Sequence, residues 1–178
     1  MATPRTEALA AGDPEAFAAL YDRLGPRLFA TARTMLASTA EAEDLVHDLF
    51  VELARTRHRL AAVAELDGYL FTMLRHAVGR RHRRRSLASR ALDRLGRERL
   101  SVDGFSTRPD EPRDEALAAA LASLPAAQRE VVALKIDGGL TFAEIAVVIG
   151  TSANTAASRY RYALEKLRAA LHAKEVRR

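Results

Sequence analysis

The chain has 178 residues, of which 48% are hydrophobic and none is cysteine. This length suits one compact domain or two small ones, and the apolar content excludes a chain that is disordered throughout. Without cysteine there is no disulfide framework, no thiolate metal site and no thiol nucleophile. The net charge of +5 favours an anionic partner without identifying it. We expect a cytoplasmic protein, because the sequence shows no signal peptide and no apolar run near the ~20 residues of a membrane helix.

Residues 1–85 have the periodicity of an N-terminal helical bundle. The pair Gly25-Pro26 is expected to interrupt the first helical stripe, with Pro26 in the first turn of a new helix. The clearest helix is "STAEAEDLVHDLFVELARTRHRL" (38–60), where Ser38 or Thr39 can be the cap. Its acidic start and basic end both complement the helix dipole. Asp67 is expected to cap a further helix that runs into a cluster of arginines.

Residues 86–113 are predicted to be a linker with one or two helical turns near Leu87–Leu95, because glycines and prolines break the later part. As a free coil this segment would span roughly 30 Å, and fully extended about 95 Å. It can therefore hold two domains far apart if something keeps it stretched. The expected fold is all-α, with two small helical domains joined by this linker.

Residues 114–178 are predicted to form four helices that include a helix-turn-helix. Pro125 opens the second helix, and "TFAE" is a capping box at the start of a short third helix, Phe142 to Ile149. Gly150 closes that helix, and Ser152 can cap a long final helix from about Ala153.

The outer face at the start of the final helix carries small polar groups and arginines. Arg can pair with guanine edges, Asn with adenine, and a helix N-terminus with phosphate. This face is a candidate DNA reader, and the alternative is an ordinary helical hairpin with a solvated polar face. Its candidate binding residues are Asn154, Thr155, Ser158, Arg159 and Arg161.

The run "RRHRRR" (80–85) follows a helix with an apolar stripe. Arginines at a helix C-terminus are favourable by themselves, so a solvated helix end is one interpretation. The other is a phosphate track, since several basic residues share one helix side. In that interpretation each neutralised phosphate adds about −0.9 to the slope of log affinity against log salt. The residues of the track are Arg75, His76, Arg80, Arg83 and Arg84.

An acidic face lies on the 38–60 helix and consists of Glu43, Asp44, Asp48 and Glu52. These carboxylates are either solvated groups that support the helix start or a docking surface for a basic partner. Glu43 and His47 at i,i+4 could touch a metal, but the face has no second histidine or cysteine. We therefore expect no metal site and no cofactor.

The order of these segments resembles the bacterial RNA polymerase sigma factors of the extracytoplasmic-function (ECF) group, over nearly the whole chain. "AEDLVHDLFVELAR" is similar to the helix that docks on the polymerase clamp, and "LDGYLFTMLRHAVGRRHRRR" to the helix that engages the minus-10 element. "LPAAQREVVALKIDGGLTFAEIAVVIGTSANTAASRYRYALEKLRAAL" resembles the minus-35 reader and is the most specific match.

The resemblance assigns roles to individual residues. Residues 57–65, with Arg57 and Arg59, match the loop that captures an unstacked base. In the next helix Arg75 matches the family's arginine, whereas His76 replaces the usual asparagine and Arg80 a frequent aspartate. Tyr69 stands where tryptophan is usual, and Ala157 where lysine is common in the recognition helix that carries Thr155, Ser158, Arg159 and Arg161. The core polymerase-binding residues are Asp44, Asp48, Phe50 and Glu52.

The expected function is an ECF-type sigma factor that binds core RNA polymerase, recognises the minus-10 and minus-35 promoter elements and performs no chemistry. Its expected partners are core polymerase and promoter DNA. The family often has anti-sigma factors, and the sequence leaves open whether one acts here. The alternative is a dimeric helix-turn-helix regulator that binds operators without polymerase, although no long heptad seam supports a dimer. An enzyme is disfavoured, because residues 1–85 contain no nucleophile–base set, metal set or phosphate-binding glycine loop.

Overall fold

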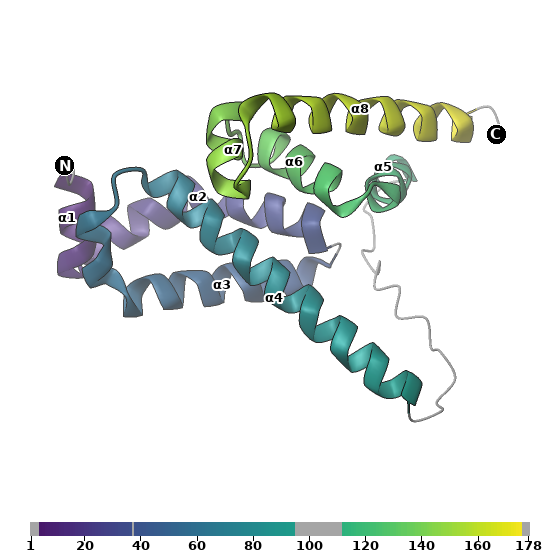
Figure 1. Ribbon diagram of the computed structural model, residues 1–178. Helices are drawn as coiled ribbons and strands as arrows, with labels where there is room; N and C mark the ends of the chain where they lie inside the picture. Colours follow the sequence, from purple (N-terminus) through teal and green to yellow (C-terminus); the bar gives the residue numbers. More distant parts are fainter. Residues whose placement is uncertain (1–3, 37, 95–111, 176–178) are drawn as a thin grey trace.

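The structure, a computed structural model, describes residues 4–36, 38–94 and 112–175, and every regular element in these ranges is helical (Figure 1). The expectation of an all-α fold is confirmed. The elements are α1 (Pro4–Ala11), α2 (Pro14–Leu36), α3 (Thr39–Arg55), the 3-10 helix η1 (Arg57–Ala62), α4 (Leu66–Arg94), α5 (Pro112–Ser123), α6 (Ala126–Ile136), α7 (Phe142–Ile149) and α8 (Ala153–Glu175).

The N-terminal bundle consists of α2, α3 and α4 around a leucine core, with α1 packed against η1. Leu24, Leu45 and Leu74 each expose 1% or less of their surface. Burying a leucine side chain contributes about 1.5–3 kcal/mol, so these residues hold the helices together. Among the described helices none is long and apolar enough to cross a membrane.

Two local expectations for this bundle are wrong. Helix α2 continues through Pro26 instead of breaking at Gly25-Pro26, because Leu24 and Leu28 on either side are buried in the same core. That burial outweighs the hydrogen bond that the proline cannot make. Helix α4 begins at Leu66, so Asp67 lies inside its first turn rather than at the cap.

Asp67 instead pairs with two arginines of α2. Its carboxylate lies 2.8 Å from Arg23 Nη2 and 3.2 Å from Arg27 Nη1. Burial alone would raise the pKa of Asp67, but the hydrogen bonds and charges of Arg23 and Arg27 outweigh it and lower that pKa below its ordinary value. The cap expected for α3 is confirmed at Ser38, whose side chain accepts from the Glu41 N–H at 3.4 Å.

The C-terminal domain consists of α5 to α8. The second helix follows Pro125 as expected, α7 has the predicted bounds, and α8 begins at Ala153. A small core between α5, α6 and α8 contains Leu124, Val132 and Leu167. Helix α4 continues to Arg94, past the expected domain boundary at residue 85, and α5 begins at Pro112. Most of the predicted linker lies outside the described residues.

The two domains pack against each other. Figure 1 shows α6 and α7 lying against α2 and α4, with the distal half of α4 projecting away from the bundle. One continuous core joins Leu28 and Phe71 of the first domain to Leu134 and Ile145 of the second. This packing decides which candidate binding residues are accessible.

Candidate nucleic-acid interface

The acidic face of α3 is open to solvent. Asp44, Asp48 and Glu52 are exposed and lie outside the buried stripe of α3. Phe50 is half-buried, and its ring meets that of Tyr21 edge-on, with centroids 4.9 Å apart and planes at 63°. The carboxylates therefore border an aromatic surface, a combination that suits docking of a protein with basic and apolar groups.

A groove of about 430 Å³ lies between α2 and α3 beside this aromatic pair. Tyr21 is 52% exposed although it belongs to the apolar stripe of α2. Sequence reasoning missed this groove, because a stripe residue at the edge of a buried face is spaced like a core residue. The sequence does contain a signal for it, because the segments of α2 and α3 carry more large apolar residues than one face of each helix can bury. The groove is lined by Tyr21, Gly25, Pro26, Phe29, Glu43, Val46, His47 and Phe50.

His47 lies on this exposed side of α3 with Glu43. Within the part of the chain that the structure describes, no three His, Asp or Glu side chains gather where they could hold a metal ion.

The arginine run of α4 divides into two sides. Arg81 donates to the Glu41 carbonyl at 2.6 Å and pairs with Asp48 at 3.2 Å, and Arg85 pairs with the Glu41 carboxylate. Residues 81 and 85 are one helical turn apart, so both face α3. They hold α4 to the acidic helix, and Asp48 keeps 74% of its side chain exposed despite its pair.

The remaining arginines of the run, Arg80, Arg83 and Arg84, are exposed and make no ion pair with any described residue. They are the three members of the run that the sequence proposes for phosphate contact. Unpaired guanidinium groups on one surface can meet a polyanion without first breaking an internal bond. Their role stays a prediction.

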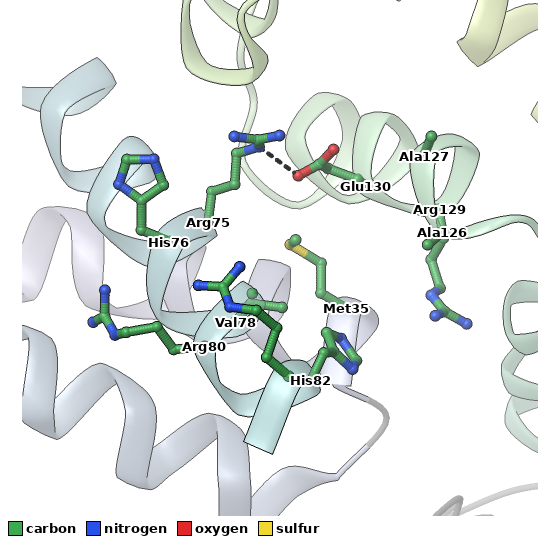
Figure 2. Close-up of a pocket in the computed structure, with 12 residues that line it drawn as sticks. Met35, Arg75, His76, Val78, Arg80, His82, Ala126, Ala127, Arg129 and Glu130 are labelled. Atoms are coloured by element: carbon green, nitrogen blue, oxygen red, sulfur yellow. Dashed lines mark hydrogen bonds and ion pairs between the residues drawn. The ribbon is translucent and has the colours of Figure 1, made fainter. Parts of the chain in front are cut away.

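Arg75 is placed differently from the rest of the track. Its Nε–H donates to Glu130 Oε1 of α6 at 2.8 Å, with 34% of the Arg75 side chain and 16% of that of Glu130 exposed. Figure 2 shows this pair at the edge of a cavity of about 410 Å³ between α4 and the start of α6. His76 is exposed and borders the same cavity.

His82 lines the cavity with Arg129 of α6 (Figure 2). Burial and the charges of Arg129 and Arg85 lower the pKa of His82, against weaker raising contributions from Met35 and Glu41. The imidazole is therefore held neutral over more of the pH range than a free histidine.

The two arginines of the loop proposed for base capture lie in η1. Arg57 donates to the Ala54 carbonyl at 3.3 Å, and its side chain lies against Gly12 at the turn between α1 and α2. A Cβ at Gly12 would come within 2.8 Å of Arg57 Nε, so Gly12 leaves room for this arginine. Arg59 is exposed and has no ion pair within the described ranges. Both side chains are exposed, and Arg57 is held more closely to its own chain than Arg59.

The helix-turn-helix has the expected caps. Thr141 Oγ1 accepts from the Glu144 N–H at 3.3 Å, and the Glu144 carboxylate accepts from the Thr141 N–H at 2.7 Å. These bonds from Thr141 lower the pKa of Glu144. Gly150 ends α7 in the left-handed region with φ of 68°, which suits glycine. Ser152 Oγ accepts from the Thr155 N–H at 3.1 Å and so caps α8.

The first turns of α8 present the predicted reading face. Its inner side is anchored by Ala156, which is wholly buried, and by Tyr160, whose ring packs edge-on against Phe142 with centroids 5.6 Å apart. Arg161 is exposed and lies over the Tyr162 ring at 5.3 Å. The five candidate residues lie together on the accessible side, Asn154 and Arg161 exposed and Thr155, Ser158 and Arg159 half-buried.

These features define a two-domain helical protein with an exposed acidic face, a basic helix and a capped helix-turn-helix. Two family models match the chain in the same order, Sigma-70 region 2 over residues 20–88 and Sigma-70 region 4 over residues 114–167. A similar protein is the ECF RNA polymerase sigma factor SigK of Mycobacterium ulcerans (strain Agy99), 29% identical over 174 residues, which are 93% of this chain and 90% of SigK.

Two solved structures are also similar. The sigma factor RpoE, in complex with the anti-sigma factor NepR from Bartonella quintana, has a TM-score of 0.74 and 25% identity, over 89% of this chain and 98% of its own. CnrH, in complex with the cytosolic domain of CnrY, has a TM-score of 0.68 and 25% identity, over 95% of this chain and 96% of its own.

The chain belongs to the sigma factors of the ECF group. It is a transcription initiation factor that acts with RNA polymerase in promoter recognition. None of these matches supports the alternative of a dimeric regulator that works without polymerase.

Proposed function

We propose that three surfaces of the chain each bind a different partner or promoter element. The face formed by Asp44, Asp48, Phe50 and Glu52 of α3 docks on core polymerase. The track Arg75, His76, Arg80, Arg83 and Arg84, with Arg57 and Arg59 of η1, engages the minus-10 element. The outer face of α8, Asn154, Thr155, Ser158, Arg159 and Arg161, reads the minus-35 element.

We assign residues 1–85 and 114–178 as the two functional domains, with residues 86–113 as the linker. The protein performs no chemistry of its own, binds no cofactor and works in the cytoplasm. The observation that carries the proposal is the exposed acidic face of α3 beside the unpaired arginines of α4, on a chain that also carries the capped reading helix.

The solved relatives RpoE and CnrH were each bound to a second protein, an anti-sigma factor in the case of RpoE. An anti-sigma factor is accordingly a proposed partner of this chain as well. It would compete with polymerase for the α2–α3 groove and the acidic face, since both are accessible in the packed molecule.

The test of core docking is a titration of labelled protein with bacterial core polymerase, read by fluorescence anisotropy. We expect the wild type to bind saturably and one-to-one. Glu52→Lys should lower the affinity about tenfold or more, because like charges brought together at an interface cost several kcal/mol. Glu52 makes no internal ion pair within the described ranges, so its substitution should leave the fold intact.

The matched control is Glu165→Lys on α8, which is also exposed and changes the net charge equally. Equal affinities of the two variants would refute the assignment of the α3 face. No binding by the folded wild-type chain would refute the whole function.

A further inference from the structure

Tyr162 is an aromatic residue of α8 that has no part in the minus-35 face proposed above. It is 51% exposed, and it belongs to neither apolar core of the molecule. Its neighbours in the sequence differ, because Tyr160 packs edge-on against Phe142 and Ala163 is wholly buried. The ring of Tyr162 is therefore a feature of the helix surface and not of the core.

That surface is the outward side of α8. With about 3.6 residues per turn, the positions one and two before the buried Ala163 lie nearly opposite to it. These positions are Arg161 and Tyr162, and both side chains are exposed. Thr155, Ser158 and Tyr162 follow one another at i, i+3 and i+7, so they share one ridge of the helix. The ring therefore continues the proposed reading face by one turn.

The Arg161 guanidinium lies over this ring. Its Cζ is 5.3 Å from the centre of the Tyr162 ring, which is a cation–π distance. Arg161 makes no ion pair with any residue that the structure describes, so the ring is what holds its guanidinium. An exposed contact of this kind favours the stacked arrangement about two- to fivefold over the other rotamers.

The contact also gives the guanidinium a direction along the helix. Aromatic side chains in helices lean back toward the helix N-terminus, which for Tyr162 is the turn that carries Ser158. A guanidinium over that ring lies nearer the first turns of α8 than one that extends into solvent. The first turns of a recognition helix are the ones that reach base edges.

An arginine placed in this way suits one base in particular. The planar guanidinium offers its N–H groups in a fixed fork and can pair with both O6 and N7 of guanine in the major groove. An unrestrained arginine loses side-chain freedom when it forms these two hydrogen bonds. Ordering of Arg161 before DNA binds reduces that loss and so strengthens the pairing.

We infer that Tyr162 is a positioning residue, whose ring holds Arg161 for pairing with a guanine of the minus-35 element. Tyr162 acts through Arg161 and not by its own contact with DNA. The inference rests on the proposed function of the α8 face and adds the class of base pair that Arg161 reads, a G·C pair.

The experiment compares two substitutions of the same residue. Tyr162→Phe keeps the ring and loses the hydroxyl, whereas Tyr162→Leu keeps an apolar side chain and loses the ring. These variants, Arg161→Ala and the double variant Arg161→Ala/Tyr162→Leu are each assembled with core polymerase. Fluorescence anisotropy then measures the affinity of each holoenzyme for promoter DNAs in which the base pairs of the minus-35 element are replaced one at a time.

Arg161→Ala should lower the discrimination at one G·C position about tenfold or more, the effect of a lost bidentate pair. Tyr162→Leu should lower it at the same position about two- to fivefold, and Tyr162→Phe should restore it. In the Arg161→Ala background Tyr162→Leu should have no further effect, because its influence passes through the arginine. The control is Leu117→Ala, which removes an apolar side chain that is 45% exposed on α5 and should change no base preference.

Different failures of this experiment have different meanings. Equal losses for Tyr162→Phe and Tyr162→Leu, no loss for Tyr162→Leu, or a loss that persists without Arg161 would each overturn the positioning role. A loss spread evenly over all positions would overturn the pairing with guanine, because phosphate contacts carry no sequence preference. If Arg161→Ala leaves every base preference unchanged, the proposed reading face fails and the inference with it.

Discussion

The two proposed reading helices, α4 and α8, are held by the rest of the molecule in different ways. Leu70, Phe71 and Leu74 of α4 are wholly buried, and the next residue, Arg75, is paired with the other domain. The first turns of α8 instead bury only small or partly exposed side chains and leave Arg161 at the surface. Helix α4 thus combines its proposed reading role with core formation and interdomain contact, whereas the start of α8 carries its proposed reading face without comparable burial.

The largest effect expected from this difference is on stability. Phe71→Ala should lower the free energy of unfolding by about 3–5 kcal/mol, because it empties a fully buried site that Arg27 and Gly138 also contact. Tyr162→Ala on α8 removes an aromatic ring that is 51% exposed and should cost much less. Urea unfolding followed by circular dichroism measures both, and equal losses would contradict the distinction between the helices.

The next effect concerns DNA affinity. Arg159→Ala and Arg161→Ala should each weaken minus-35 recognition by about 1–3 kcal/mol if they contact bases, with little change in Tm. Arg168→Ala, an exposed arginine farther along α8, is the control and should leave the upstream preference unchanged. The test measures how tightly the assembled holoenzyme binds promoters that differ in the minus-35 element. An unaltered preference among these promoters in both protein variants would count against the assigned face.

Within α4 the two sides of the arginine run should differ in salt dependence. Arg83→Ala should reduce the slope of log affinity against log salt by about 0.9, the value of one lost phosphate contact. Arg81→Ala should leave the slope nearly unchanged and lower stability instead, because Arg81 binds the Glu41 carbonyl and Asp48. Holoenzyme binding to promoter DNA at several salt concentrations measures both slopes. Identical slopes for the two variants would show that internal ion pairs do not decide which arginines of the run contact phosphate.

The smallest expected effect is a pH dependence of the interdomain interface. Burial raises the pKa of Asp137, against the lowering effects of the Thr34 hydrogen bond and the charge of Arg33. The Asp137 carboxyl therefore binds a proton more tightly in the packed state than in the separated state. Packing should become more favourable as the pH falls from the raised pKa toward the ordinary pKa of a carboxyl group. At neutral pH Asp137 is charged, so its burial destabilises the packed state to the full extent.

Asp137→Asn removes that charge while an acceptor for Thr34 remains. At neutral pH it should favour the packed state, because the buried carboxylate charge is gone. The difference from the wild type should shrink below about pH 4, where the native carboxyl is protonated. The interdomain distance measured across this pH range tests it, and a constant difference at all pH values would exclude Asp137 as the titrating group.

Local features of the chain followed directly from the sequence. The cap at Ser38, the capping box of Thr141 and Glu144, and the glycine that ends α7 all form as predicted. Each depends on hydrogen bonds between residues only a few positions apart, so the surrounding fold hardly alters them. The candidate reading face of α8 is accessible for the same reason, since its periodicity alone separates inner from outer residues.

Features that depend on residues far apart in the sequence could not be predicted from it. The continuation of α2 through Pro26, the pairing of Asp67 with arginines and the exposure of Tyr21 each reflect a neighbour that is far away in the sequence. Spacing set Arg81 and Arg85 apart from the track, but it did not show that they pair with Asp48 and Glu41, because α3 comes to lie beside α4 only in the folded chain.

By itself the sequence determined the helical class, the capped helix-turn-helix and the set of residues from which the interfaces are drawn. Only the tertiary structure decided which of those residues are free, through the packing of α6 and α7 on α2 and α4. Helix periodicity and capping arise from interactions within one or two turns. The pairing of Arg75 with Glu130 joins residues 55 positions apart, and such a contact exists only once two independently formed surfaces meet.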